Sequence, residues 1–281
     1  MAPPSADHST TNEPLNPTAT TFSPATPPSS QQPPDGEWHP STVLSTFPLH
    51  SQPQSSTASP VPFFHLLSRL KTTPREGWRR FGINHGESIA DHMYRMSIIT
   101  LLCPTSLSST LDLNRCTRMA LVHDMAEALV GDITPVDGVP KPEKSRREAE
   151  TMDYICTSLL GSVDGGAQGR EIREVWQEYE DGKTRESHFV HDVDKVELLL
   201  QMLEYERAHE GSLDLGEFVW VAKRIEMPEV QVWAKELLEG REEFWKERGV
   251  VPGAEEAVGK ETKQQQDEYY GNGHSNGGQA P

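Results

Sequence analysis

Four polar side chains lie close together in a segment that otherwise has the pattern of a buried helix. They are His123, Asp124, Glu127 and Asp132. Apolar residues recur around them at helical spacing, Glu127 follows His123 by one turn, and Gly131 predicts that the helix ends before Asp132. Polar groups on an apolar helix are costly to bury unless something pairs with them. The pattern therefore predicts a site for a bound cation.

Two other expected helices each carry a polar residue close to an apolar stripe. Ser88 is a good N-cap for the first, and His92 lies one position from its buried stripe. Taken alone, such a histidine is more often a satisfied core residue than a ligand. The second helix, expected over residues 186–209, places Asp194 at the edge of its core-facing side, where an ionised carboxylate needs a partner.

Together, these three helices offer two imidazoles and two carboxylates as metal ligands. The residues are His92, His123, Asp124 and Asp194. Adjacent residues of a helix point about 100° apart, so His123 and Asp124 are expected to bracket an ion and leave its other sides for the remaining pair. Mixed nitrogen and oxygen ligands favour Mn²⁺, Fe²⁺, Co²⁺, Ni²⁺ or Zn²⁺ over Ca²⁺, and the set lacks the thiolates of structural zinc sites.

An arginine-rich segment is a second candidate for chemistry. Residues 75–80, Arg-Glu-Gly-Trp-Arg-Arg, gather three arginines around Trp78. We interpret the segment as a loop at the rim of the pocket, where an arginine could grip phosphate oxygens. The alternative is a solvated loop with one packed tryptophan.

Composition limits the classes of function. The chain has 281 residues, a formal net charge of −17 and 35% hydrophobic residues. These values predict one medium-sized domain with disordered ends, and they argue against nucleic-acid binding, which needs a basic surface. No apolar run reaches the roughly 18 residues of a membrane span, and the N-terminus lacks the pattern of a targeting segment. We expect a cytoplasmic protein, and the sequence does not decide between cytosol and nucleus.

The elements that would position these residues are all helical. No alternating β pattern of useful length is present, so we predict an all-α fold with a single helical domain over residues 60–248. Composition predicts a Pro/Ser/Thr-rich disordered tail over residues 1–59 and a second disordered tail over residues 249–281. We interpret Trp38 and Phe47, in the first tail, as incidental aromatics, with a short docking motif as the alternative. The remaining helices are expected near residues 63–70, 114–130, 141–160, 172–181, 215–225 and 229–248.

The pattern H…HD…D on an all-helical chain resembles the HD-domain metal-dependent phosphohydrolases. The neighbouring residues resemble the 5′-deoxynucleotidase branch, the YfbR-like group that includes HD domain-containing protein 2. The motifs are ESIADHMYRM at 87–96, LVHDMAE at 121–127, Gly131-Asp132 and KSRRE at 144–148. The resemblance covers roughly residues 62–247 and implies a single HD-domain helical bundle.

The resemblance also implies roles for individual residues. The primary metal ligands would be His92, His123, Asp124 and Asp194. The catalytic acidic pair would be Glu127 and Asp132, and this pair could also hold a second divalent ion. Arg75 and Trp78 would contact phosphate and sugar, and the ring of Trp78 over the sugar would favour deoxyribose. Because Gly77 precedes the tryptophan, Arg79 and Arg80 stay alternatives to Arg75. Which of the two acids is base and which is acid stays open.

The activity implied is divalent-metal-dependent hydrolysis of (deoxy)nucleoside 5′-monophosphates to nucleoside and inorganic phosphate. Mn²⁺ or Co²⁺ is the expected metal, with Mg²⁺ as an alternative. One alternative function is another HD phosphohydrolase specificity, acting on cyclic nucleotides or nucleoside triphosphates. The other is a non-catalytic helical scaffold with a structural metal. A homodimer is also implied, and the apolar segment 233–245 is the expected contributor to its interface.

Overall fold

The computed structural model of the protein describes residues 37–253, and within that range it is helical. In place of a sheet it has one isolated bridge, between Pro74 and Ser88. The prediction of an all-α fold is therefore confirmed. The α-helices are α1 (Pro40–Ser45), α2 (Val61–Leu67), α3 (Glu76–Arg79), α4 (Ile89–Leu101), α5 (Thr105–Ser108), α6 (Leu113–Val122), α7 (Glu127–Val130), α8 (Lys141–Asp153), α9 (Ala167–Asp181), α10 (Arg185–Ala208) and α11 (Pro228–Glu247). Shorter 3-10 and π segments are η1 (Leu49–Ser51), η2 (Ser68–Lys71), η3 (Tyr154–Leu159), η4 (Val163–Gly166) and η5 (Gly216–Arg224).

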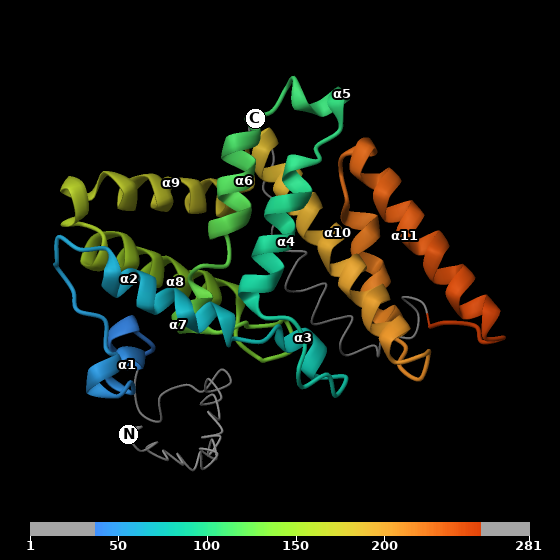
Figure 1. The fold of residues 1–281 in the computed structure, drawn as a ribbon, viewed down its shortest axis with the longest axis horizontal. Coiled ribbons are helices and arrows are strands. Elements are labelled where there is room, and N and C mark those ends of the chain that lie inside the picture. The colour runs from blue at the N-terminus through green and yellow to red at the C-terminus, as the bar shows by residue number, and fades with distance from the viewer. Residues whose placement is uncertain (1–36, 254–281) are drawn as a thin grey trace, which may run out of the picture.

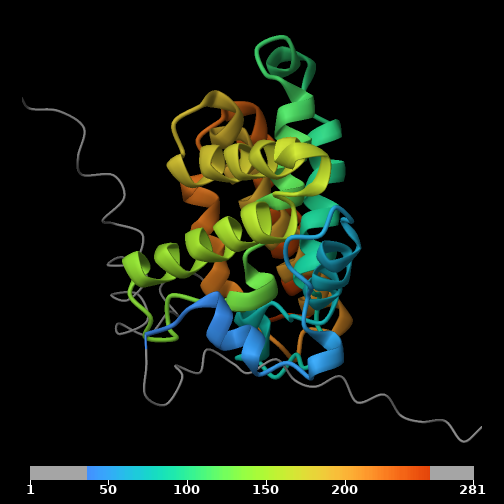
Figure 2. The ribbon, with the colours of Figure 1, turned by 90° about the vertical axis from the view of Figure 1, so that its left-hand side faces the viewer.

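Helix α10 is the centre of the arrangement. It packs against α4, α6, α9, α11 and η5, while α4 and α6 pack closely on each other. Figure 1 shows α4 and α6 beside α10, with α11 along the outer side of α10. The smaller helices α1, α2 and α7 lie with α8 at the other end of the molecule, which Figure 2 shows from the side. No helix within residues 37–253 combines the length and apolar character needed to cross a membrane.

The expected apolar stripes form the core. Ile89, Met93 and Met96 of α4 are buried. The valines of α10, which packs against α4, are buried too. Helix α4 begins with a complete capping box, in which Ser88 accepts from the backbone N–H of Asp91 and the Asp91 carboxylate accepts from that of Ser88. The cap fixes where α4 starts and therefore the direction of His92, one turn later.

The prediction of one continuous helix from Asn114 to Val130 is wrong at its centre. Helix α6 ends at Val122, residues 123–126 form turns, and α7 begins at Glu127. The N–H of Glu127 bonds to the carbonyl of Asp124, three residues back, while the carbonyl of His123 accepts a hydrogen bond from the Trp176 indole at 3.0 Å. A partner from a distant helix thus takes the carbonyl that would have continued the α pattern.

The N-terminal boundary also differs from the prediction. We expected residues 1–59 to be a disordered tail, but residues 37–47 pack on the domain, with α1 formed and Trp38 only 5% exposed. One buried aromatic ring anchors a segment whose average composition predicts disorder. The rest of this predicted tail, residues 1–36, and most of the C-terminal one, residues 254–281, lie outside the described residues.

Candidate metal centre

The four predicted ligands converge from α4, the turn after α6, and α10. Nε2 of His92 lies 3.2 Å from Oδ1 of Asp194 and 3.8 Å from Oδ2 of Asp124. Nε2 of His123 lies 3.3 Å from the same Asp124 oxygen. One ligand atom from each of His92, His123 and Asp194 lies within 4.8 Å of the other two, a spacing that a single ion can span.

The donor set fits a divalent cation. Nε2 of His92 and Nε2 of His123 are buried, and neither has a hydrogen-bond partner among residues 37–253. Buried polar atoms without partners are rare in folded proteins and call for an explanation. A cation between these nitrogens and the two carboxylates would satisfy both, and nitrogen and oxygen ligands of this kind suit a divalent transition metal.

The electrostatics also call for positive charge at this point. Burial would raise the pKa of Asp124 and of Asp194, but the neighbouring imidazoles and Arg75 hold both pKa values well below their usual range. Burial and Arg75 would lower the pKa of His92, yet the carboxylates of Glu197 and Asp194 raise it to about 10. The two aspartates are therefore ionised, and the site favours whatever cation, proton or metal, lies between them.

Behind His92 lies a carboxylate that the sequence analysis missed. Nδ1 of His92 is 2.6 Å from Oε2 of Glu197, which is fully buried, and Nε of Arg95 donates to the other oxygen of Glu197 at 2.8 Å. Glu197 follows Asp194 by three residues and so lies on the same face of α10. That spacing, with Val196 before Glu197 and three leucines after it, was the signal that could have identified it.

Helix α9 supports the other histidine. The ring of His123 packs against Tyr179 with the ring centroids 4.9 Å apart, and its Nδ1 lies 3.0 Å from the carbonyl of Ala120. The hydroxyl of Tyr179 donates to Oδ2 of Asp194 at 3.4 Å. Tyr179 therefore holds a ligand from the turn and a ligand from α10 in one arrangement.

The predicted acidic pair lies beside these ligands. Glu127 is 2% exposed, with Oε1 3.8 Å from Nζ of Lys144, and its Oε2 is buried without a hydrogen-bond partner in the described part of the chain. Burial, with the charges of Asp124 and Asp132, raises the pKa of Glu127 well above its ordinary value. Oδ2 of Asp132 accepts a hydrogen bond from the backbone N–H of Glu76 at 2.6 Å, which ties the loop after α7 to the start of α3.

Of the three arginines in residues 75–80, Arg75 faces the site. Its Nη1 donates to Oδ2 of Asp124 at 3.3 Å, and its Nε lies 4.0 Å from Oε1 of Glu87. Arg79 and Arg80 pair with the carboxylates of other residues, at 2.8 and 2.7 Å. The structure thus distinguishes among three arginines that the sequence left as alternatives.

Trp78 is placed differently from the expectation. Its indole is 2% exposed, donates to Oε1 of Glu87 at 2.8 Å, and packs on the rings of Tyr205 and Phe218 with centroids 5.4 and 4.7 Å away. The ring therefore presents almost no surface from which to contact a ligand. Its contact with a substrate sugar stays a prediction.

Comparison with known proteins places this geometry in a family. A family model described as HD domain matches residues 67–233, a span that contains α4, α6, α7 and α10. The chain belongs to the HD-domain family. Dependence on a divalent metal follows from this membership, and the ligand groups described above are present for it.

Individual relatives of this HD-domain chain are named for one activity. The 5′-deoxynucleotidase hdd1 of Schizosaccharomyces pombe is 48% identical over 191 residues, which is 68% of this chain and 94% of the relative. The 5′-deoxynucleotidase YGK1 of Saccharomyces cerevisiae is 44% identical over 183 residues, 65% of this chain and 83% of the relative. The solved structure of HD domain-containing protein YGK1 aligns with a TM-score of 0.53 at 33% identity and covers 74% of this chain and 100% of the solved chain.

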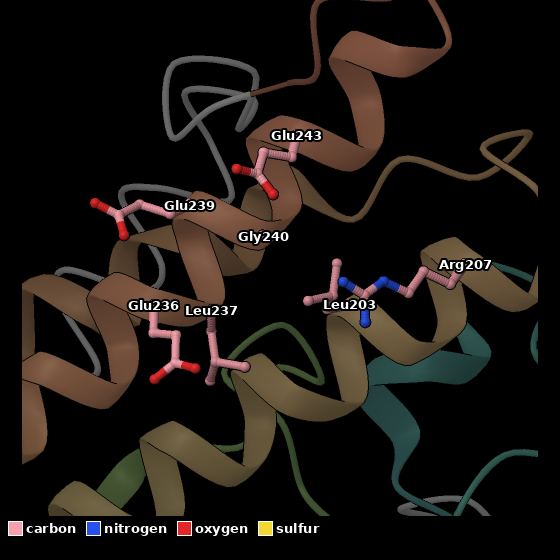
Figure 3. Close-up of a pocket in the computed structure, with 7 residues that line it drawn as sticks. All are labelled: Leu203, Arg207, Glu236, Leu237, Glu239, Gly240 and Glu243. Atoms are coloured by element: carbon pink, nitrogen blue, oxygen red, sulfur yellow. The ribbon is translucent and has the colours of Figure 1, made fainter.

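A cleft in this HD-domain chain lies apart from the metal centre, between α10 and α11 (Figure 3). It has a volume of about 450 Å³ and is lined by Leu203, Arg207, Glu236, Leu237, Glu239, Gly240 and Glu243. None of the predicted site residues lines it, and the carboxylates of α11 give it an acidic wall. It is therefore separate from the predicted site.

Proposed function

We propose that the protein is a divalent-metal-dependent 5′-deoxynucleotidase that hydrolyses (deoxy)nucleoside 5′-monophosphates to nucleoside and inorganic phosphate. The observation that carries the proposal is the pair of unpartnered imidazole nitrogens, on His92 and His123, facing two ionised aspartates beside Glu127. The 48% and 44% identity to proteins named 5′-deoxynucleotidase supports the choice of substrate.

His92, His123, Asp124 and Asp194 are the proposed metal ligands, with Mn²⁺ or Co²⁺ favoured and Mg²⁺ as the alternative. When bound, the metal acts as a Lewis acid toward the phosphate and lowers the pKa of a water molecule. Three of these ligands are already held in place, because Glu197 bonds to His92 and Tyr179 contacts both His123 and Asp194.

Glu127 is the proposed general base. Its raised pKa makes its carboxylate a better proton acceptor than an exposed glutamate, so it can orient the attacking water and take its proton. The proton that Glu127 takes from the water is the one that the departing 5′-oxygen needs, and Asp132, held by the backbone N–H of Glu76, is the group proposed to pass it on. The same pair, Glu127 and Asp132, could also hold a second divalent ion.

Arg75 is the proposed phosphate contact. Its guanidinium already bonds to Asp124, so it lies beside the ligands and can offset charge on the phosphate oxygens. Trp78 keeps its proposed role in substrate recognition, but its burial indicates that it acts through its neighbours. Its indole donates a hydrogen bond to Glu87, and Glu87 in turn lies 4.0 Å from Nε of Arg75. A preference for deoxyribose would arise at this corner of the site.

The proposal is tested with the full purified chain. Bound metal is determined first, and a panel of ribo- and deoxyribonucleoside monophosphates, cyclic nucleotides and triphosphates is then assayed for phosphate, pyrophosphate and triphosphate separately. We expect inorganic phosphate from deoxynucleoside monophosphates, abolished by a chelator and restored by Mn²⁺ or Co²⁺. Release of triphosphate or cleavage of a cyclic diester would indicate another HD specificity. Bound metal without any hydrolysis would indicate the scaffold.

A homodimer and a cytoplasmic location complete the proposal. Trp245, in the segment expected at the dimer interface, is 2% exposed and donates to Glu206 of α10, so it is buried within its own chain. That residue is therefore not available to an interface. Sedimentation at micromolar concentration tests the dimer, and a sedimenting species of monomer mass alone would remove it. Imaging of the tagged chain tests the location.

A further inference from the structure

The segment of residues 37–47, here called the N-terminal segment, contains α1, which packs on α7 and α8 (Figure 1). Trp38 is 5% exposed and forms a small apolar cluster with Val130 and Ile133. These two residues lie on either side of Gly131-Asp132, and Val130 closes the short helix that Glu127 opens. The ring of Trp38 thus packs on both sides of Asp132 and on the last residue of the helix that begins with Glu127.

The same tryptophan is tied to α8. The guanidinium of Arg147 lies 5.6 Å from the centroid of the Trp38 ring, and Nη2 of Arg146 donates to the Trp38 carbonyl at 3.0 Å. Nδ1 of His39 lies 2.9 Å from Oε2 of Glu150. Trp38 therefore sits between α7, with its apolar neighbours, and α8, with its arginines.

A second contact reaches α7 from the end of the segment. The guanidinium of Arg69 lies 4.3 Å from the centroid of the Phe47 ring, and its Nε donates to the carbonyl of Ala128 at 2.5 Å. Helix α7 has four residues and is preceded by a turn. So short a helix has little stability of its own, and its position depends on what packs against it.

We infer that Trp38 is a positioning residue that holds α7 against α8. It thereby sets the position of Glu127 relative to Lys144 of α8 and relative to Asp132. The metal ligands lie on other elements: α4, the turn after α6, and α10. Removing the ring should therefore disturb the acids and leave the metal site intact. The match to the HD-domain family model begins at residue 67, so the N-terminal segment lies outside the matched residues. The inference rests on the proposed function.

The test compares Trp38→Ala and Trp38→Phe in the full chain, loaded with Mn²⁺. For dAMP we expect Trp38→Ala to lower kcat by about 10- to 100-fold, since a displacement on the order of 1 Å of a catalytic group has effects of this size. KM and bound Mn²⁺ per chain of Trp38→Ala should stay within about two-fold of wild type. Trp38→Phe should recover most of kcat, since it keeps an aromatic ring at this position. Together these readouts separate positioning of the acids from metal binding. If Trp38→Ala does not fold, Val130→Ala trims the other side of the contact and should lower kcat in the same way.

Phe244→Ala is the matched control. Phe244 is also a buried aromatic under an arginine, 8% exposed with Arg248 3.6 Å above its ring, but it lies on α11, away from the acids. It should lose thermal stability and keep kcat at a temperature where it is folded. The inference is overturned if folded Trp38→Ala keeps kcat, if it loses Mn²⁺ together with activity, or if Phe244→Ala loses kcat equally. A wild-type chain inactive on every monophosphate would instead refute the proposed function, and this inference with it.

Discussion

Nδ1 of His92 donates a hydrogen bond to the buried carboxylate of Glu197 across 2.6 Å. Burial would raise the pKa of Glu197, but His92 and Arg95 hold it below its usual range, so the carboxylate is ionised. An ionised carboxylate can only accept hydrogen bonds. The ring proton that Glu197 requires is therefore the one on Nδ1, and the nitrogen left for a ligand is Nε2, which faces Asp124 and Asp194. One buried glutamate thus determines which face of His92 can bind a metal.

Glu197→Gln should weaken metal binding. The amide keeps the size of the side chain but not its charge, so Nδ1 of His92 is held less firmly, and an outer contact of this kind is worth about 10- to 100-fold in metal affinity. Titration of the metal-free protein with Mn²⁺ measures the effect. Glu204→Gln is the control, because Glu204 also pairs with Arg95, at 2.7 Å, but is exposed. Equal affinities of the two variants would show that Glu197 does not support the ligand.

Glu127→Gln should separate catalysis from metal binding. Loss of the proposed base should lower kcat for dAMP by about 10²- to 10⁴-fold, with KM and bound metal unchanged. Steady-state kinetics and metal analysis on the same preparation give both quantities. Glu148→Gln changes the other carboxylate beside Lys144, 3.4 Å from its Nζ, and should have a much smaller effect. Full hydrolysis by a metal-loaded Glu127→Gln variant would contradict the assignment.

Arg75→Ala should weaken binding of the substrate phosphate. A hydrogen bond to a charged group is worth about 1.5–3 kcal/mol, so we expect kcat/KM for dAMP to fall by roughly 10- to 100-fold. Arg80→Ala should change it by less than about two-fold, because Arg80 pairs with the partly exposed Glu217 at the surface. Initial rates over a range of dAMP concentrations suffice for both variants. A larger loss in Arg80→Ala would reassign the phosphate contact.

His191 should make the stability of the fold depend on pH. Burial, with the charge of Lys195, lowers the pKa of His191 from 6.5 to about 4. The unfolded chain therefore binds a proton over this range that the folded chain does not, so stability falls as pH decreases from 6.5 toward 4. Between about pH 7 and pH 5 the free energy of unfolding should fall by about 1–2 kcal/mol more in wild type than in His191→Gln.

Urea unfolding at the two pH values measures this difference. Glutamine at position 191 can still donate to the carbonyl of Tyr179, which the histidine reaches at 3.0 Å, but it does not titrate. Parallel pH dependences of wild type and variant would show that His191 is not the group responsible.

The N-terminal segment shows why composition misled the prediction for residues 37–59. Disorder was inferred from the average over a long Pro/Ser/Thr-rich stretch, and an average gives no weight to one well-placed ring. Trp38 is buried because its ring packs against Val130, Ile133 and Arg147, which lie about a hundred residues away along the chain. Nothing in the sequence around Trp38 indicates that these contacts exist.

By itself the sequence determined the helices and the residues able to bind a metal. Periodicity, the Ser88 cap and Gly131 act within a few residues, and ionisable groups beside an apolar stripe stand out without knowledge of the fold. Only the tertiary structure decided that Arg75 faces the site and that Glu197 supports His92. It also decided that the helix after Val122 is interrupted. Each of these depends on a contact between distant segments, and local propensity carries no information about which distant group will be near.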